Sequence, residues 1–139
     1  MPEPIAALVA LLQTDPPTAA LTSGRVYGGE LPREEVPQMP RAAVVLRPAG
    51  GGLLGRAYQA WGDVRVDVDC FGATPKAAWD LHRAVRTAMK AMRREVHDGT
   101  LIHWARLSAD AVLARDPDTD WPTAPSSWQV LAADEEVIP

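Results

Sequence analysis

The chain has little cysteine, no excess of basic residues and no long apolar run. Its 139 residues include one cysteine, Cys70, which excludes an internal disulfide and fits a reducing compartment. The 14 basic and 18 acidic residues give a net charge of −4, whereas a domain dominated by nucleic-acid binding usually has a clear basic excess. The longest apolar run, Ile5 to Leu12, covers about 12 Å as a helix, against about 30 Å of bilayer hydrocarbon. The composition therefore argues against a disulfide scaffold and a membrane-spanning protein.

A glycine-rich stretch is the feature closest to a nucleotide-binding motif. Residues Gly50 to Gly55 match the spacing GxGxxG and follow a predicted strand. That motif needs a helix between its loop and the next strand, and a parallel crossover takes at least about 10–12 residues. Only Arg56 to Asp63 separates the stretch from the next predicted strand, so we interpret the loop as the turn of a hairpin. No Walker pattern occurs, and no nucleotide cofactor is expected.

The metal-binding patterns are also incomplete. Asp116, Asp118 and Asp120 resemble the start of a calcium loop, but position six is Trp121 and position twelve is Ser127, where glycine and glutamate are needed. The prolines of this segment fit a rigid turn better. One cysteine and three separated histidines give almost no support to a structural zinc site, and no GxSxG elbow is present. The sequence therefore predicts no bound metal, no cofactor and no enzymatic activity.

Proline and glycine divide the first half of the chain into short elements. Ile5 to Gln13 is predicted to be a helix, which ends before Asp15-Pro16-Pro17 because a residue that precedes proline avoids the α region. Arg41 to Arg47 is predicted to be a strand that ends at Pro48. Ala49 to Gly55 is predicted to be a loop.

The clearest alternation lies within Tyr58 to Phe71 and predicts a half-buried strand. Its apolar side is formed by Val64, Val66, Val68 and Cys70. Its polar side carries Asp67 and Asp69, about 7 Å apart along the strand. Such a pair suits acid/base chemistry or a cation, but we favour a solvated outer face paired to arginines of a neighbouring strand. Cys70 is then an inert, buried thiol.

The second half begins with a long predicted helix. Thr74 is a good N-cap and Pro75 suits the first helical position, and Asp98-Gly99 is predicted to end the helix. Its apolar stripe at 3.6-residue spacing is Ala78, Leu81, Val85, Ala88, Met89, Met92 and Val96. Leu101 to Ala114 and Ser127 to Ala133 are predicted strands, the latter with Trp128 and Val130 on one face.

The predicted order of elements is α-β-β-α-β-β, in one domain over residues 1–139. We expect an α+β fold of two layers. In it, a four-stranded, mostly antiparallel sheet packs against one long and one short helix.

A basic stripe shares the long predicted helix with an aromatic residue. It comprises Trp79, Arg83, Arg86, Lys90, Arg93, Arg94 and His97. Three interpretations stay open: a grip on nucleic-acid phosphate, a solvated face with cations near the helix C-terminus, and a contact with an acidic protein neighbour.

Several segments in this order resemble a known family of virion proteins. They are Gly24-Arg25-Val26-Tyr27 with Leu31-Pro32, the strand Val64 to Gly72, the helix start Thr74 to Trp79 and the turn Arg115 to Asp118. This pattern is similar to the tail-terminator (tail-completion) family of long-tailed phages, of the lambda minor tail protein U type, with relatives in prophages and gene transfer agents. The resemblance covers roughly Ile5 to Val137.

The resemblance implies a structural protein that forms a ring, expected to be hexameric. The ring caps the tail tube, ends its polymerisation and offers a surface to the head-neck complex, so the expected partners are other copies, the tail-tube protein and a head-neck connector. Its expected place is the head-proximal end of the virion tail, after assembly in the host cytoplasm. The family has no catalytic residues to transfer. The segment Asp116 to Ser127 departs from the family through Pro117, Pro122, Pro125 and Trp121.

An open sheet has two edges that invite pairing, and a head-to-tail contact that closes by rotation makes a ring. Because six copies at −4 total −24, DNA would pass through without specific binding, and we expect Asp67 and Asp69 toward the lumen. The candidate interface residues are Arg47, Gly51, Gly52, Leu53, Leu54, Arg56, Trp79, Arg83, Arg86, Lys90 and Trp121.

Three alternatives to a tail terminator are retained. A neck or head-to-tail joining protein of the same fold has the same sequence features. A small nucleic-acid-binding module would use the basic helix face, and a small hydrolase using Asp67 and Asp69 is more distant.

Overall fold

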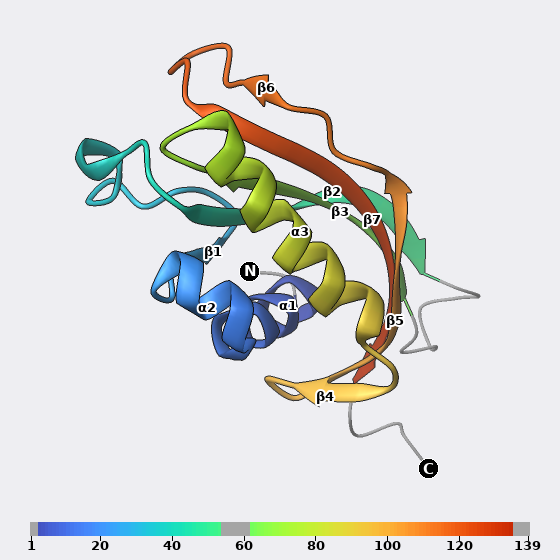
Figure 1. Ribbon diagram of the computed structural model, residues 1–139. Coiled ribbons are helices and arrows are strands. Elements are labelled where there is room, and N and C mark those ends of the chain that lie inside the picture. Colours follow the sequence, from blue (N-terminus) through green and yellow to red (C-terminus); the bar gives the residue numbers. More distant parts are fainter. Residues whose placement is uncertain (1–2, 54–61, 135–139) are drawn as a thin grey trace.

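The computed structural model describes residues 3–53 and 62–134 (Figure 1). The helices are α1 (Glu3–Thr14), α2 (Pro16–Thr22), the 3-10 helix η1 (Val36–Gln38) and α3 (Pro75–Ala91). The strands are β1 (Val26–Gly28), β2 (Ala43–Leu53), β3 (Gly62–Phe71), β4 (Glu95–His97), β5 (Thr100–Ala109), β6 (Ala114–Arg115) and β7 (Pro122–Asp134). None of the described helices is long and apolar enough to cross a membrane.

The strands form one curled sheet in the order β1-β2-β3-β7-β5-β4, with β6 paired to β7. Strand β1 runs parallel to β2, and all other neighbours are antiparallel. The expected mixed fold with a mostly antiparallel sheet is confirmed, but the expected number of four strands is wrong, since the described residues form seven.

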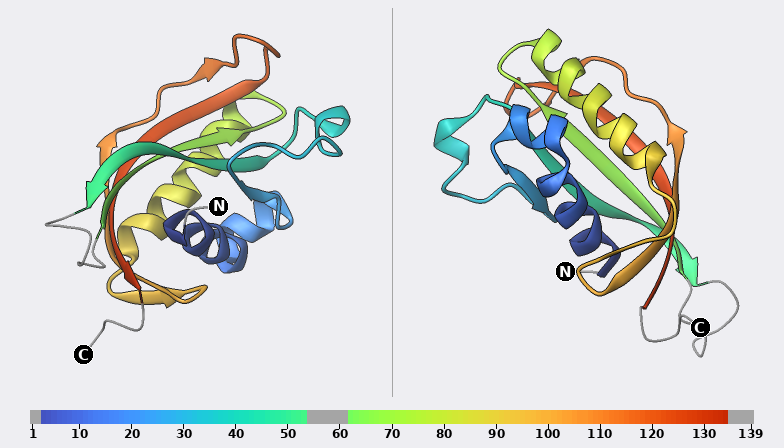
Figure 2. Two further views of the ribbon diagram at one scale, coloured as in Figure 1. Left: turned by 180° about the vertical axis from the view of Figure 1, so that it is seen from behind. Right: turned by 60° about the horizontal axis from the view of Figure 1, so that its bottom comes forward.

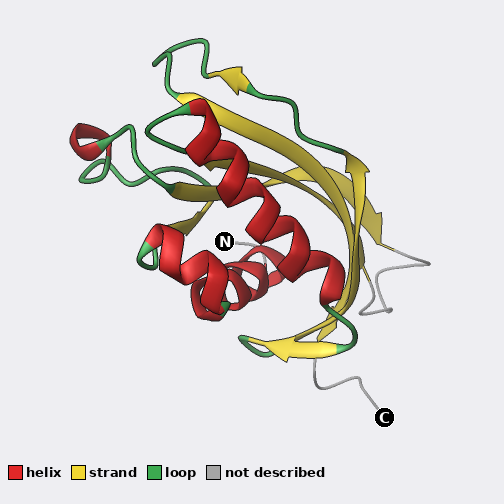
Figure 3. Cartoon of the chain, in the orientation of Figure 1, coloured by secondary structure: helices red, strands yellow, loops and turns green. Residues whose placement is uncertain are grey.

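The helices cover one face of the sheet and leave the other face without a covering layer among the described elements (Figures 1, 2 and 3). Helix α3 packs across β3, β7 and β5, while α1 packs near β1 and α2 lies between α1 and α3. Trp128, Leu46 and Leu81 are among the largest completely buried side chains. Trp128 and Val130 share the buried face, as predicted. Ile5, Leu8 and Leu12 of α1 are also completely buried, so the core lies between the sheet and helices α1 and α3.

Strand β3 has the alternation that the sequence predicts. Val66, Val68 and Cys70 are completely buried, while Arg65 is exposed and the two aspartates are half-buried. The strand is followed by Gly72, where an added Cβ would lie 2.8 Å from the carbonyl carbon of Ala77. This close approach lets the chain turn directly into α3.

Helix α3 begins as predicted and ends earlier than predicted. Thr74 Oγ1 accepts a hydrogen bond from the backbone N–H of Ala77 at 3.1 Å, and Pro75 opens the helix. The helix stops at Ala91 and not at Asp98-Gly99. Residues 98 and 99 have left-handed backbone angles of 51° and 77° and turn the chain between β4 and β5. Asp-Gly is a strong hairpin-turn signal, and the hydrogen bonds of that hairpin replace those of a longer helix.

The other differences concern strand ends. Strand β2 continues past Pro48 to Leu53 with an irregularity between Pro48 and Gly51, so part of the predicted glycine loop is strand. Proline is tolerated there because no strand pairs with that side of β2 beyond Leu46 in the described part of the chain. Strand β7 starts at Pro122, ahead of the predicted Ser127, and β5 ends at Ala109, ahead of Ala114.

Candidate functional site

Those predicted interface and lumen residues that the structure describes fall in four places. Arg47, Gly51, Gly52 and Leu53 lie on β2, and Trp79, Arg83, Arg86 and Lys90 lie on α3. Asp67 and Asp69 lie on the helix-free face of β3, and Trp121 directly precedes β7. Leu54 and Arg56 lie outside the described residues.

The two aspartates are bound to neighbouring strands. Arg47 Nη1 lies 2.6 Å from Asp69 Oδ2, and Arg47 Nε donates to the carbonyl of Gly29 at 3.2 Å. Asp67 Oδ1 accepts a hydrogen bond from Ser127 Oγ at 2.8 Å. Burial raises the pKa of Asp69, although Arg47 opposes this. The arrangement agrees with the predicted outer face paired to an arginine.

A cleft of about 320 Å³ opens on this face. It is lined by Arg47, Asp67, Asp69, Ala109, Asp110, Pro125, Ser126 and Ser127. Asp69 is ion-paired and Asp67 is hydrogen-bonded to a serine, so neither carboxylate is set up as a proton donor beside a base. The described residues contain no group of three or more histidine, cysteine, aspartate or glutamate side chains placed to hold a metal ion.

The turn before β7 is a rigid structure, as its prolines predict. Asp116 Oδ1 accepts hydrogen bonds from the backbone N–H groups of Asp118 and Thr119 at 2.9 and 3.0 Å. Trp121 packs edge-on against Phe71, with ring centroids 6.0 Å apart. Trp121 is thus half-buried against the end of β3.

The predicted basic stripe is not continuous. Arg93, Arg94 and His97 lie beyond the end of α3, because the helix stops at Ala91. Within α3, Arg86 Nη1 lies 3.1 Å from Asp110 Oδ2. The other two cations of the predicted stripe that lie on α3, Arg83 and Lys90, line two separate clefts. The positions of these cations therefore do not favour a single phosphate-binding face on the helix.

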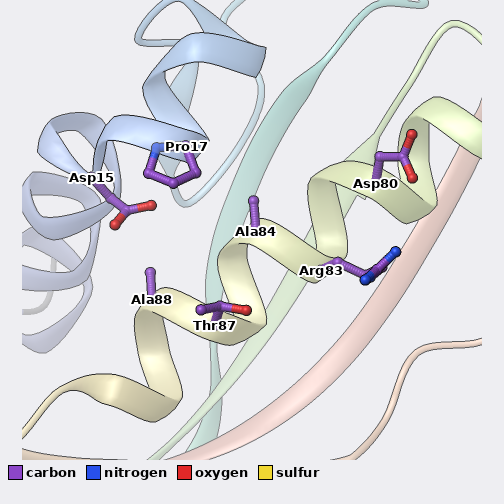
Figure 4. A pocket seen from close by; sticks show the side chains of 7 residues that line it. All are labelled: Asp15, Pro17, Asp80, Arg83, Ala84, Thr87 and Ala88. Atoms are coloured by element: carbon purple, nitrogen blue, oxygen red, sulfur yellow. The ribbon is translucent and has the colours of Figure 1, made fainter.

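Arg83 lines a cleft of about 390 Å³ between α2 and α3 (Figure 4). Asp15 faces this cleft, but its carboxylate caps α2 by accepting hydrogen bonds from the backbone N–H and hydroxyl of Thr18 at 3.2 and 2.8 Å. Asp80 is paired with Lys76 at 2.8 Å. In Figure 4 the Arg83 guanidinium points away from Asp15. The cleft brings no nucleophile and base together.

A second cleft, of about 530 Å³, lies where the end of α3 meets the edge of β5. Lys90 and Arg93 line it from one side, and Trp104 to Leu107 from the other. The guanidinium carbon of Arg106 lies 4.1 Å from the centre of the Trp104 ring, a cation–π arrangement. The predicted basic stripe includes Lys90 and Arg93 of this cleft but not Trp104 and Arg106. The contact between those two residues depends on their both facing outward from a bulged strand.

A buried histidine was also missed. His82 is completely buried on α3, with its Nε2 3.0 Å from Asp110 Oδ1 and its ring 5.2 Å from that of Trp79. Burial lowers the pKa of His82, although Asp110 opposes this. The available signal was its place beside Leu81 and Val85 on the apolar side of the helix. One histidine and one exposed aspartate fix a tertiary contact and do not form a catalytic set.

Comparisons with known proteins agree with a structural role. The family model of the tail completion protein gp17 matches residues 6–124. A chain in a solved structure of the virion of a native gene transfer agent particle has the same fold, with a TM-score of 0.70, 18% identity and 92% coverage of each chain. None of the curated proteins matches this sequence. The resemblance seen in the sequence is thereby confirmed: the chain belongs to the tail completion protein gp17 family, whose members are structural virion proteins and not enzymes.

Proposed function

We propose that this protein forms a ring, hexameric in its complete form, that caps the tail tube and ends its polymerisation. The observation that carries the proposal is the family match over residues 6–124. The ring also offers a surface to a head-neck connector. It sits at the head-proximal end of the tail, after assembly in the host cytoplasm.

The ends of the sheet support a ring. In the described chain, β1 pairs only with Val44 to Leu46 of β2, and β4 pairs only with Thr100 to Ile102 of β5. The sheet therefore has two open edges on opposite sides. A head-to-tail contact between unlike edges closes into a ring when the rotation between neighbouring copies is a whole fraction of a full turn.

We place the helix-free face toward the central channel, with Asp67 and Asp69 among the lumen residues. Arg47 partly neutralises Asp69, so the lining is less negative than the count of aspartates suggests. The net charge of −4 per copy still gives −24 for six copies. A ring of net negative charge lets DNA slide through without capture, because DNA affinity comes mainly from contacts between cations and phosphates.

Deleting the gene and measuring tail lengths by electron microscopy tests this function. We expect tails of variable, excessive length without attached heads, and a return to normal length when the gene is supplied in trans. Headless tails of normal length would instead identify a neck or head-to-tail joining protein of the same fold. Normal particles would exclude both functions.

A further inference from the structure

The open edge of β5 is basic. In the cleft beside it, Lys90, Arg93 and Arg106 are exposed, and none of its lining residues is acidic. Arg93 Nη1 donates to the carbonyls of Lys90 and Met92, both at 2.7 Å, which fixes its guanidinium at the end of α3. On this edge, the carbonyl of His103 accepts a hydrogen bond from the backbone N–H of Arg94 at 3.0 Å. From Trp104 onward no described strand pairs with this edge.

The opposite edge of the sheet has an acidic border. The connector after β1 is tied to β2, because Gly29 N–H donates to the Leu46 carbonyl at 2.8 Å. Glu30 and Glu34 are exposed on this connector, together with the single exposed cation Arg33. Figure 1 shows the connector with η1 on the left and β5 on the right. The two edges therefore differ in charge and face opposite ways.

The acidic connector is held rigidly. Glu35 is buried and accepts hydrogen bonds from Arg41 Nε and Nη2 at 2.5 and 2.9 Å. Since Glu35 is fixed, the neighbouring Glu34 is presented from an ordered segment. A preformed surface loses less conformational entropy when a partner binds.

Strand directions also match between the edges. Three antiparallel steps separate β2 from β5, so these two strands run in opposite directions. A rotation about an axis along the strands preserves strand direction. The β2 edge of the next copy then runs antiparallel to β5 and continues the same hydrogen-bond pattern. Glycines at positions 50–52 of β2 add no side chains that would keep another backbone away.

We infer that the basic cleft along β5 of one copy binds the β2 edge and the Glu30–Glu34 connector of a second copy. This inference rests on the proposed ring and names its contact. Lys90, Arg93 and Arg106 face the carboxylates of the neighbour, and unpaired backbone groups of β5 and β2 complete a shared sheet.

Charge exchange between the two edges tests the inference. One variant carries Lys90→Glu and Arg106→Glu, and the other carries Glu30→Lys and Glu34→Lys. All four side chains are exposed, and circular dichroism verifies that both variants fold. Arg65→Glu, an exposed change on β3 away from both edges, is the matched control. Assembly on tail-tube ends is followed by light scattering and native mass spectrometry.

Each variant alone should need at least about tenfold more protein to assemble than the wild type, because like charges then face each other. An equal mixture should regain assembly, with the two variants in a 1:1 ratio, since unlike edges meet again. The control should assemble normally. Normal assembly of either variant alone, or a mixture that stays unassembled, would overturn the inference. Failure of the wild type to assemble would instead overturn the proposed ring.

Discussion

The imidazole of His82, completely buried on α3, lies 3.0 Å from the carboxylate of Asp110 at the end of β5. The same carboxylate accepts from Arg86 at 3.1 Å and from the N–H of Ala111 at 2.8 Å. These contacts draw the chain toward α3 just where it leaves the β5–β7 ladder. The following residues, Val112 and Leu113, are 69% and 50% exposed. The histidine therefore joins the helix layer to the sheet edge.

Replacing His82 with asparagine should flatten the pH dependence of stability. Burial lowers the pKa of folded His82, so the unfolded chain binds more protons near its ordinary pKa of about 6.5. The free energy of unfolding of the wild type should thus fall as the pH is lowered through about 6.5. Its slope against pH should correspond to the uptake of at most one proton per chain on unfolding. Urea unfolding at several pH values measures this.

His103 needs its own control in that experiment. Its pKa is lowered by burial and by Arg94, so it contributes in the same direction. The variant His103→Asn should remove a separate part of the pH dependence. Identical curves for the wild type and His82→Asn would show that the His82–Asp110 contact has no thermodynamic effect.

Glu35→Gln should lower stability near neutral pH and have little effect in acid. Hydrogen bonds from Arg41 hold the pKa of Glu35 below its usual range. A carboxyl of this kind stabilises the fold above its unfolded pKa of about 4.3, and the stabilisation is lost as the pH falls through the lower, folded pKa. Urea midpoints of the variant and the wild type should therefore differ near neutral pH and converge in acid, once the pH lies below the folded pKa of Glu35. Glu34→Gln, at an exposed neighbour, should match the wild type throughout.

Gly72→Ala should destabilise the fold by about 1–3 kcal/mol, because its methyl group would overlap the backbone at Ala77 and Ala78. Thermal unfolding followed by circular dichroism gives the change. Ala73→Ser, at the next and exposed position, should have little effect. An unchanged melting temperature for Gly72→Ala would mean that the junction between β3 and α3 is looser than described.

Cys70 should resist thiol reagents until the chain unfolds. The side chain is completely buried, and burial raises the pKa of its thiol well above the usual value. A chromogenic disulfide reagent should therefore label one thiol per chain in denaturant and almost none in the native protein. Fast labelling of the native protein would contradict the burial of β3.

The sequence predicted elements whose signals are local. The cap Thr74 with Pro75, and the alternation that ends at Cys70, depend on neighbouring residues and were right. Strand β1 was missed because three residues are too few to show a period, and it forms only because β2 lies beside it. The end of α3 was wrong because Asp98-Gly99 serves equally as a helix stop and as a hairpin turn.

The clefts could not be predicted from the sequence, because each is lined by residues that lie far apart in the chain. Lys90 and Arg106 are 16 positions apart and share a cleft only because the β4–β5 hairpin brings the chain back beside α3. His82 and Asp110 meet across 28 positions in the same way. Charge counts identified the basic residues of the helix, but not which of them lie together.

Native mass spectrometry of the purified protein, with and without tail-tube ends, tests the ring most directly. We predict a closed homo-oligomer of six copies, which forms either without tube ends or when tube ends are supplied. A protein that stays monomeric under both conditions would contradict it.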